Sequence, residues 1–271
     1  LGPFVSAGVA TLALVGLIVA VIVLWKPPQF PELLVVGPRA DGTLAAHPTA
    51  TQSHAATMLA EWTNAGGDRP KLGADPSTLT DKDGWKAKLN PAAKSVVLAF
   101  AAHGDADPAG PYLWFPAGDA KAVDESQKLR VKEILDRLAG LPADQPKLLI
   151  FDATQVPAGW AFGSTHNDFA RAVKELEPEI EKVPGLAVIL SSDADQTSAV
   201  AEEWRSSAFA HFLGEGLNGA ADRGAGRITA VDLFEYLKRE LPKWSQANRD
   251  LEQLPVLLPA AGEALVSDIL P

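Results

Sequence analysis

The sequence predicts an α/β domain with a mostly parallel central sheet, preceded by one transmembrane helix. Short apolar runs alternate with longer segments whose apolar residues recur at helical spacing, a pattern typical of a parallel sheet covered by helices on both faces. Apolar residues make up 47% of the 271 residues, enough for a large buried core. A stretch without charged side chains, residues 4–25, predicts the separate membrane helix.

The uncharged stretch Phe4–Trp25 has the length of a membrane-spanning helix, which needs about 20 apolar residues. Trp25 and Lys26 stand at its end, where an indole and a positive charge favour the membrane interface. Pro27 and Pro28 follow and are expected to end the helix. A cleaved signal peptide is the alternative, but its apolar region would be shorter, about 7–15 residues. We therefore expect a transmembrane anchor.

The anchor divides the chain into two parts. Residues 1–28 are expected to hold the anchor, and residues 29–271 are expected to form a single domain. The chain begins with Leu1 rather than Met, so we expect upstream sequence to be missing. A formal net charge of −10 argues against a nucleic-acid partner, because phosphate binding needs clustered Lys and Arg. The absence of cysteine excludes disulfides, thiolate zinc sites and a thiol nucleophile.

Four apolar runs are predicted to form the buried strands of the sheet. The first ends at Gly37 and Pro38, which interrupt a strand, and the second leads into the pair His103-Gly104. The third ends in polar residues, and the fourth ends in two serines. In chain order the predicted strands are 32–36, 94–102, 147–153 and 185–192.

The segments around these runs predict helices. In residues 130–140 the apolar side chains fall on one helical face, and a glycine ends the segment. Thr229 and Asp232 are spaced as a capping box at the start of the last helix. The Gly- and Pro-rich stretch 64–91 is expected to be loop with one short helix. The predicted helices are 51–62, 130–140, 167–183 with an interruption at Pro178, 206–217 and 228–241.

Polar residues follow two of the predicted strands. His103 and Gly104 come after the second strand, while Asp152 and Thr154 come at the end of the third. Ligands of open α/β sheets bind beyond the carboxyl ends of the strands, and parallel neighbours bring those ends together. His103 and Thr154 are therefore candidate partners across a cleft.

At these residues the chain resembles the caspase-like peptidases, the group of caspases, metacaspases and bacterial caspase-like proteins. In that family the catalytic His stands in a His-Gly pair after an apolar strand, and the nucleophilic Cys ends a later strand. Here VVLAFAAHGD contains the pair, at His103 and Gly104. LLIFDATQ matches the later strand, with Thr154 where the Cys belongs.

Other stretches resemble the same family in the same order: GPYLWFPAGDA, VILSSDADQTSA, the segment from SSAFAHFL to DLFEYL, and QLPVLLP. The resemblance covers about residues 33–259. It implies a three-layer caspase-like fold of bacterial type. The charges that flank the anchor do not decide the orientation of this single-pass membrane protein. The resemblance favours the cytoplasmic side for the domain.

The departure at Thr154 decides the expected function. A cysteine is a few per cent ionised at neutral pH, whereas a threonine hydroxyl depends wholly on a base such as His103. The β-methyl of Thr154 also stiffens the side chain. We expect a degenerate His103–Thr154 pair in a pseudoprotease that binds a peptide or protein partner as a scaffold or regulator. The alternative is a peptidase that uses Thr154, Ser191 or Ser192 as its nucleophile.

The resemblance also implies residues that bind a peptide. Asp152 matches the acidic residue that lines the first specificity pocket of metacaspases and selects Arg or Lys; its alternative role is to cap a loop or pair with a base. Gly104 belongs to the same cleft. Asp193 and Asp195 would deepen a negative pocket, or else form a solvated acidic loop. Trp204 is a candidate cleft residue, although tryptophans more often serve packing.

No metal or cofactor is expected. The histidines outside the His-Gly pair show no paired metal-ligand spacing. Residues 222–232 superficially resemble a calcium loop, but Gly224 and Gly226 occupy positions where oxygen ligands are required. We interpret this segment as a turn before the last helix.

Overall fold

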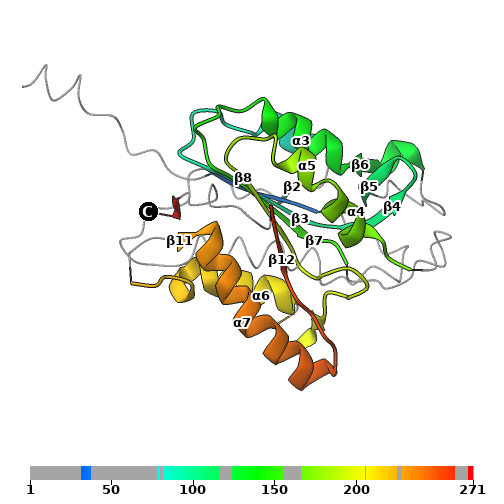
Figure 1. The fold of residues 1–271 in the computed structure, drawn as a ribbon, viewed down its shortest axis with the longest axis vertical. Coiled ribbons are helices and arrows are strands. Elements are labelled where there is room, and N and C mark those ends of the chain that lie inside the picture. Colours follow the sequence, from blue (N-terminus) through cyan, green and yellow to red (C-terminus); the bar gives the residue numbers. More distant parts are fainter. Residues whose placement is uncertain are drawn as a thin grey trace, which may run out of the picture.

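The computed structural model describes residues 32–37, 78–79, 82–115, 124–154, 166–204, 206–224, 228–259 and 268–270. A six-stranded sheet forms its centre, and helices cover both faces (Figure 1). The predicted anchor at residues 1–28 and the predicted helix at 51–62 lie outside the described residues. None of the described helices combines the length and apolar character that crossing a bilayer requires.

The central sheet is parallel except at one edge. Its strands follow the order β12-β8-β7-β3-β1-β2, and β12 runs antiparallel to β8. The mostly parallel sheet and its four predicted strands are therefore confirmed. The strands are β1 Glu32–Val36, β2 Thr78–Leu79, β3 Val96–Ala101, β7 Lys147–Asp152, β8 Leu186–Leu190 and β12 Val256–Leu258.

The two middle strands lead into the candidate site. β3 pairs with β7 in a register that runs from Val96 opposite Lys147 to Ala101 opposite Asp152. Both strands are buried along their whole length, because helices cover both faces of the sheet. The register brings the residues that follow each strand to the same edge of the sheet.

Helices form one layer on each face of the sheet (Figure 1). One layer contains α3 Val131–Ala139, α4 Phe169–Glu175 and α5 Glu177–Ile180, and the other contains α6 Ala208–Glu215 and α7 Ala230–Arg249. Alternate residues of β7 serve the two layers. Leu149 packs in the cluster with α3 and α4, whereas Leu148 and Ile150 pack in the cluster with α6 and α7.

Local signals account for the helix ends. The Thr229 hydroxyl accepts a hydrogen bond from the Asp232 N–H at 3.1 Å, and the Thr229 N–H donates to the Asp232 carboxylate at 3.2 Å. The predicted capping box at the start of α7 is thus confirmed. The interruption expected near Pro178 is confirmed too, since α4 and α5 are separate helices and this proline lies in the first turn of α5.

The structure adds short strands that the sequence pattern does not predict. β4 His103–Asp107, β5 Gly110–Trp114 and β6 Lys128–Arg130 form a small antiparallel sheet, while β9 Val200–Ala201 pairs with β10 Ser206–Ser207 and β11 Ile228–Thr229 pairs with β13 Asp268–Leu270. The strands of two or three residues are too short to show an alternation of apolar and polar residues, and the five residues of β4 and of β5 do not alternate in this way. The helix predicted at 206–217 begins two residues later in the structure, because Ser206 and Ser207 form β10.

Short helical turns complete the described elements. The expected short helix in residues 64–91 is η1, whereas β2 in the same stretch was not expected. The turns are η1 Gly84–Ala87, η2 Glu125–Gln127, η4 Glu202–Trp204 and η5 Gly216–Ala220.

Candidate functional site

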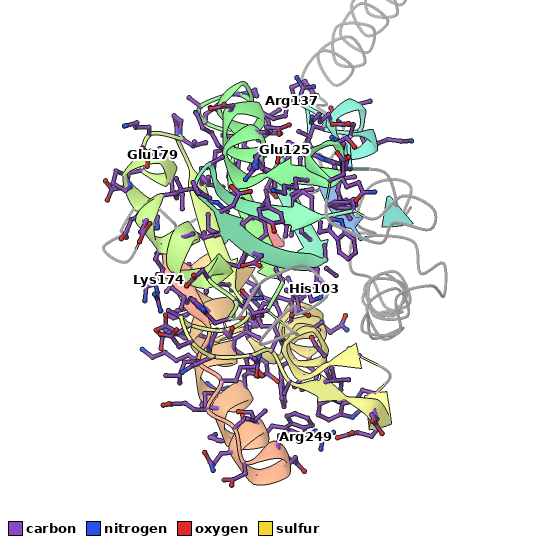
Figure 2. All side chains as sticks on the ribbon, turned by 90° about the vertical axis from the view of Figure 1, so that its right-hand side faces the viewer. His103, Glu125, Arg137, Lys174, Glu179 and Arg249 are labelled. Carbon is purple, nitrogen blue, oxygen red and sulfur yellow. The ribbon has the colours of Figure 1, made fainter. Side chains whose placement is uncertain are left out.

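The segments that follow β3 and β7 lie side by side, as the sequence predicts. His103 begins β4 two residues after β3, and Thr154 stands two residues after β7. The Gly104 N–H donates a hydrogen bond to the Ala153 carbonyl at 2.9 Å, which joins the two segments directly. Figure 2 shows His103 near the middle of the molecule, between the two helical layers. The topology therefore brings His103 and Thr154 to one edge of the sheet.

Gly104 is required by close packing. A Cβ atom on this residue would lie 2.6 Å from the Phe169 ring and 2.9 Å from the Ala153 Cβ, both too short for carbon atoms. The Gly104 carbonyl accepts a hydrogen bond from the Asn167 side-chain amide at 2.9 Å. The His-Gly pair is thus held between β7 and the start of α4.

The Thr154 hydroxyl belongs to a buried group of three hydroxyls. It shares a hydrogen bond of 2.6 Å with the Ser192 hydroxyl and lies 3.3 Å from the Ser191 hydroxyl. We call Thr154, Ser191 and Ser192 the hydroxyl cluster; their exposed fractions are 3%, 1% and 0%. The two serines directly follow β8, so three different strand ends contribute to this edge of the sheet.

His103 is buried beside an aromatic ring. Its side chain is 8% exposed, and its ring centroid lies 6.5 Å from that of Trp114, its cross-strand neighbour in β5. The Trp114 indole N–H donates to the Gln127 side chain at 3.0 Å, which fixes the tryptophan. The imidazole therefore has an ordered packing partner on the small sheet.

Asp152 is buried and accepts hydrogen bonds from two serines. Its Oδ1 accepts from the Ser198 hydroxyl at 2.8 Å, and its Oδ2 accepts from the Ser207 hydroxyl at 2.5 Å. The side chain is 4% exposed. Nothing in the local sequence around either serine predicts this role, because their pattern does not differ from that of other serines in the chain.

Gln253 connects this region to the C-terminal part of the chain. Its side-chain amide donates to the Ser191 carbonyl at 2.9 Å and to the Ser198 hydroxyl at 3.3 Å. Its amide oxygen accepts from the Ala199 N–H at 3.0 Å, and the side chain is completely buried. Gln253 opens the stretch QLPVLLP, which carries part of the sequence resemblance, but its local pattern does not indicate these partners.

Asp193 and Asp195 form ion pairs with α4. Lys174 lies 2.7 Å from Asp193, and Arg171 lies 2.7 Å from Asp195. Burial acts to raise the pKa of the Asp193 carboxyl, but hydrogen bonds from Lys174 and from the Ala194 N–H hold that pKa below its ordinary value. The negative charge of this loop is therefore balanced by two basic side chains of the neighbouring helix.

Trp204 packs against α6 and α7. Its ring stacks on His211 with 3.6 Å between centroids and 11° between planes, and it lies 5.1 Å from the Trp244 ring. The structure thus gives this tryptophan a packing role. Elsewhere, no group of three or more His, Cys, Asp or Glu side chains within the described part of the chain is placed to hold a metal ion.

Comparison with known proteins finds a similarity in fold, to solved structures. No protein-family model matches the chain, and no curated protein matches it. Among solved structures, caspase-1 from Spodoptera frugiperda superimposes with a TM-score of 0.53 and 12% identity, covering 84% of this chain and 86% of the caspase. The fold is caspase-like. At this low identity the similarity concerns the fold alone, and the caspase's activity is not transferred to this chain.

The caspase-like fold agrees with the resemblance read from the sequence. The strands that end near His103 and Thr154 are the neighbours that the resemblance requires. The hydroxyl cluster, the Asp152 carboxylate and the His-Gly pair therefore all lie at the carboxyl ends of neighbouring parallel strands.

Proposed function

We propose that this chain is a membrane-anchored caspase-like domain of bacterial type that binds peptides without cleaving them. The observation that carries the proposal is the state of the hydroxyl at Thr154. It is 3% exposed, and its close partner is the Ser192 hydroxyl at 2.6 Å. An attacking group needs access to a peptide carbonyl and a base that removes its proton.

The chemistry of Thr154 supports lost hydrolysis. The chain contains no cysteine, so no thiolate is available anywhere in it. Threonine nucleophiles of known hydrolases use a chain-terminal amine as base, and Thr154 is internal. A hydroxyl that shares a hydrogen bond with another hydroxyl gains no basic partner from it. His103 and Thr154 are thus proposed to be a degenerate form of a catalytic pair.

Asp152 is the proposed recognition residue for an Arg or Lys side chain of the bound peptide. This role is supported by the resemblance, in which Asp152 matches the acidic residue of the first specificity pocket; its two oxygens accept hydrogen bonds from Ser198 and Ser207. A guanidinium matches a carboxylate with two parallel donors.

Peptide assays on the full chain test this proposal. Fluorogenic peptides ending in Arg, Lys or Asp are expected to give no turnover above that of the Thr154→Ala variant. Non-cleavable versions are expected to bind, with the Arg and Lys peptides tighter than the Asp peptide and weakened by Asp152→Asn. Turnover that disappears in both Thr154→Ala and His103→Ala would show a peptidase instead.

The proposed anchor has its own test. Residues 4–25 contain no charged side chain, which supports a helix that spans the bilayer. The full chain is expected to stay with membranes after a wash at high salt and alkaline pH, whereas residues 29–271 alone are released. Release of the full chain by the same wash would contradict the anchor.

A further inference from the structure

The loop after β8 is bonded to Thr154 at both of its ends. At its start, the Ser191 and Ser192 hydroxyls lie 3.3 and 2.6 Å from the Thr154 hydroxyl. At its end, the Ser198 N–H donates to the Thr154 carbonyl at 3.0 Å. We call residues 191–198 the cover loop. A solute that binds the Thr154 hydroxyl has to displace these bonds.

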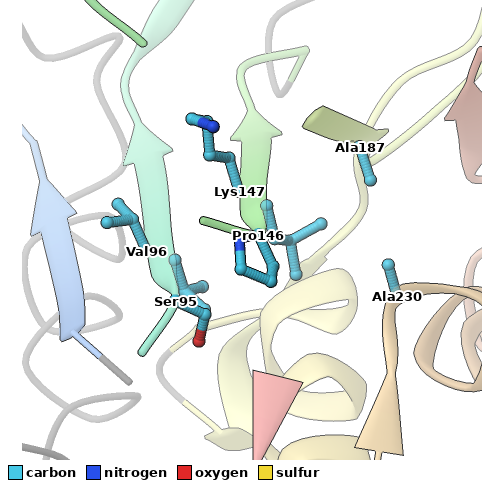
Figure 3. Close-up of a pocket in the computed structure, with 8 residues that line it drawn as sticks. Ser95, Val96, Pro146, Lys147, Ala187 and Ala230 are labelled. Carbon is cyan, nitrogen blue, oxygen red and sulfur yellow. The ribbon is translucent and has the colours of Figure 1, made fainter. Parts of the chain in front are cut away.

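The cavity in Figure 3 does not offer another route to this hydroxyl. It lies among Ser95, Pro146 and Lys147, at the beginning of β3 and β7. Thr154 follows the other end of β7. The position of the cover loop is therefore the feature to examine for access to the hydroxyl cluster.

The tip of the cover loop is a tight turn that carries two carboxylates. The Gln196 N–H donates to the Asp193 carbonyl at 3.2 Å, and Asp195 has a φ of 63°, in the left-handed region that Asp and Asn tolerate better than most residues. The Ser192 hydroxyl donates to the Gln196 carbonyl at 3.3 Å. The turn is thus connected directly to the hydroxyl that bonds to Thr154.

Two ion pairs join this turn to α4. Lys174 lies 2.7 Å from Asp193, and Arg171 lies 2.7 Å from Asp195. The two basic residues are three positions apart on the helix, so they lie on one face. All four side chains are between 35% and 69% exposed. Ion pairs this exposed are individually weak and are screened by salt.

On its other side the cover loop bonds to the segment before β12. The Gln253 amide donates to the Ser191 carbonyl at 2.9 Å, and the Leu254 N–H donates to the Gln196 side-chain oxygen at 2.8 Å. These bonds join neutral groups, which salt does not screen. Among the described contacts of the loop, the ion pairs with α4 are those that respond to ionic strength.

We propose that the two ion pairs form an electrostatic latch, which keeps the cover loop closed over Thr154. Screening or removing the pairs shifts the loop towards an open form, in which the hydroxyl cluster meets solvent. Access to this edge of the sheet therefore depends on ionic strength. The proposal holds whether or not a peptide binds at the site, so it stands apart from the proposed function.

Hydrogen exchange followed by mass spectrometry on the full chain in detergent tests the latch, because exchange reports how often a segment opens. Protection is compared for the cover loop and for β8, which serves as the reference within the same molecule. The salt concentration is raised from about 0.01 M, where the Debye length is about 30 Å, to about 1 M, where it is about 3 Å.

The variants separate the latch from general effects of charge. Asp193→Asn combined with Asp195→Asn removes both ion pairs while keeping the size of the side chains, and Asn tolerates the backbone conformation at position 195. Asp136→Asn is the matched control. It removes an exposed ion pair with Lys132 on α3, 3.1 Å long, that does not involve the cover loop.

In the wild type, high salt is expected to lower the protection of the cover loop by about 2- to 10-fold, the effect of losing two exposed ion pairs, with β8 unchanged. The double variant is expected to show this loss already at low salt and no further change with salt, whereas Asp136→Asn behaves as the wild type. Unchanged protection in the double variant, or an equal loss in β8, overturns the proposal.

A second measurement connects opening of the loop with access to position 154. In a Thr154→Cys background, the double variant is expected to react with iodoacetamide faster by the same factor of about 2- to 10-fold. A loop that exchanges faster without faster alkylation would show that the ion pairs hold the turn but do not control access, which also overturns the proposal.

Discussion

The hydroxyl of Thr154 lies 2.6 Å from the hydroxyl of Ser192, and both side chains are buried. Thr154 follows β7 and Ser192 follows β8, so this hydrogen bond joins the ends of two neighbouring strands of the sheet. The contact therefore stabilises the packing of the two strand ends against each other.

Thr154→Val is expected to destabilise the domain by about 0.5–1.5 kcal/mol, because it keeps the shape of the side chain but removes the hydrogen bond to the buried Ser192 hydroxyl, which retains its bond to the Gln196 carbonyl at 3.3 Å. Thr154→Ser retains the hydroxyl and is expected to cost less. Chemical denaturation of both variants measures the difference. Equal unfolding free energies for Thr154→Val and the wild type would show that this hydrogen bond adds nothing.

Thr154→Cys is expected to remain inactive on fluorogenic peptides, because burial disfavours the thiolate form. The chain has no other cysteine, so iodoacetamide reports on this position alone. We expect alkylation in the folded protein to be at least about tenfold slower than in the unfolded protein. Rapid alkylation with measurable turnover would show instead that sulfur is the one missing part of a working site.

Gly104→Ala is expected to destabilise the domain by about 1–3 kcal/mol, since its Cβ would overlap the Phe169 ring and overpacking has costs of this size. Gly140→Ala is the control, because its Cβ would meet its nearest neighbour, the Arg137 carbonyl oxygen, at 3.4 Å. Its effect is expected to stay within about 0.5 kcal/mol. Thermal melting measures the stability of both variants. Similar losses of stability in Gly104→Ala and Gly140→Ala would contradict the packing argument.

Asp107 provides a prediction about pH. Arg130 donates to both of its carboxylate oxygens, at 2.6 and 3.0 Å, and Lys128 donates to one of them at 2.5 Å. Hydrogen bonds from Arg130 first, and then from Lys128, hold the pKa of Asp107 far below its ordinary value despite partial burial. The folded state thus prefers the ionised carboxylate.

A pKa that folding lowers contributes stability above the unfolded-state pKa, about 3.9 for Asp, and this contribution is lost as the pH falls below it. Asp107→Asn is therefore expected to be less stable than the wild type at pH 7, by about 1.5–3 kcal/mol, with the difference shrinking towards pH 2. Urea denaturation between pH 2 and 7 measures it. A difference that does not change with pH would exclude this charge pairing as its source.

The central sheet is the part of the fold that the sequence predicts well. The runs that contain Val97, Leu149 and Val188 are continuous and apolar because both of their faces are covered, and this pattern is visible without tertiary information. The placement of His103 and Thr154 at the same end of the sheet follows from the same reasoning, since neighbouring parallel strands have their carboxyl ends at one edge.

The polar contacts of the site are not predictable in this way. Ser198, Ser207 and Gln253 acquire their roles from partners 46 to 62 residues away along the chain. Hydroxyl and amide side chains have no periodic pattern that identifies a distant acceptor. Trp204 illustrates the same limit, because its stacking on His211 depends on how η4 meets α6.

The position of Gln253 has a consequence for the order of synthesis. Its amide reaches back 62 residues to the Ser191 carbonyl, from the segment that precedes β12. His103, Asp152 and Thr154 leave the ribosome well before it. A growing chain therefore carries His103, Asp152 and Thr154 while the side chain that donates to the Ser198 hydroxyl is still absent, so this region completes its hydrogen bonds only when the segment before β12 docks.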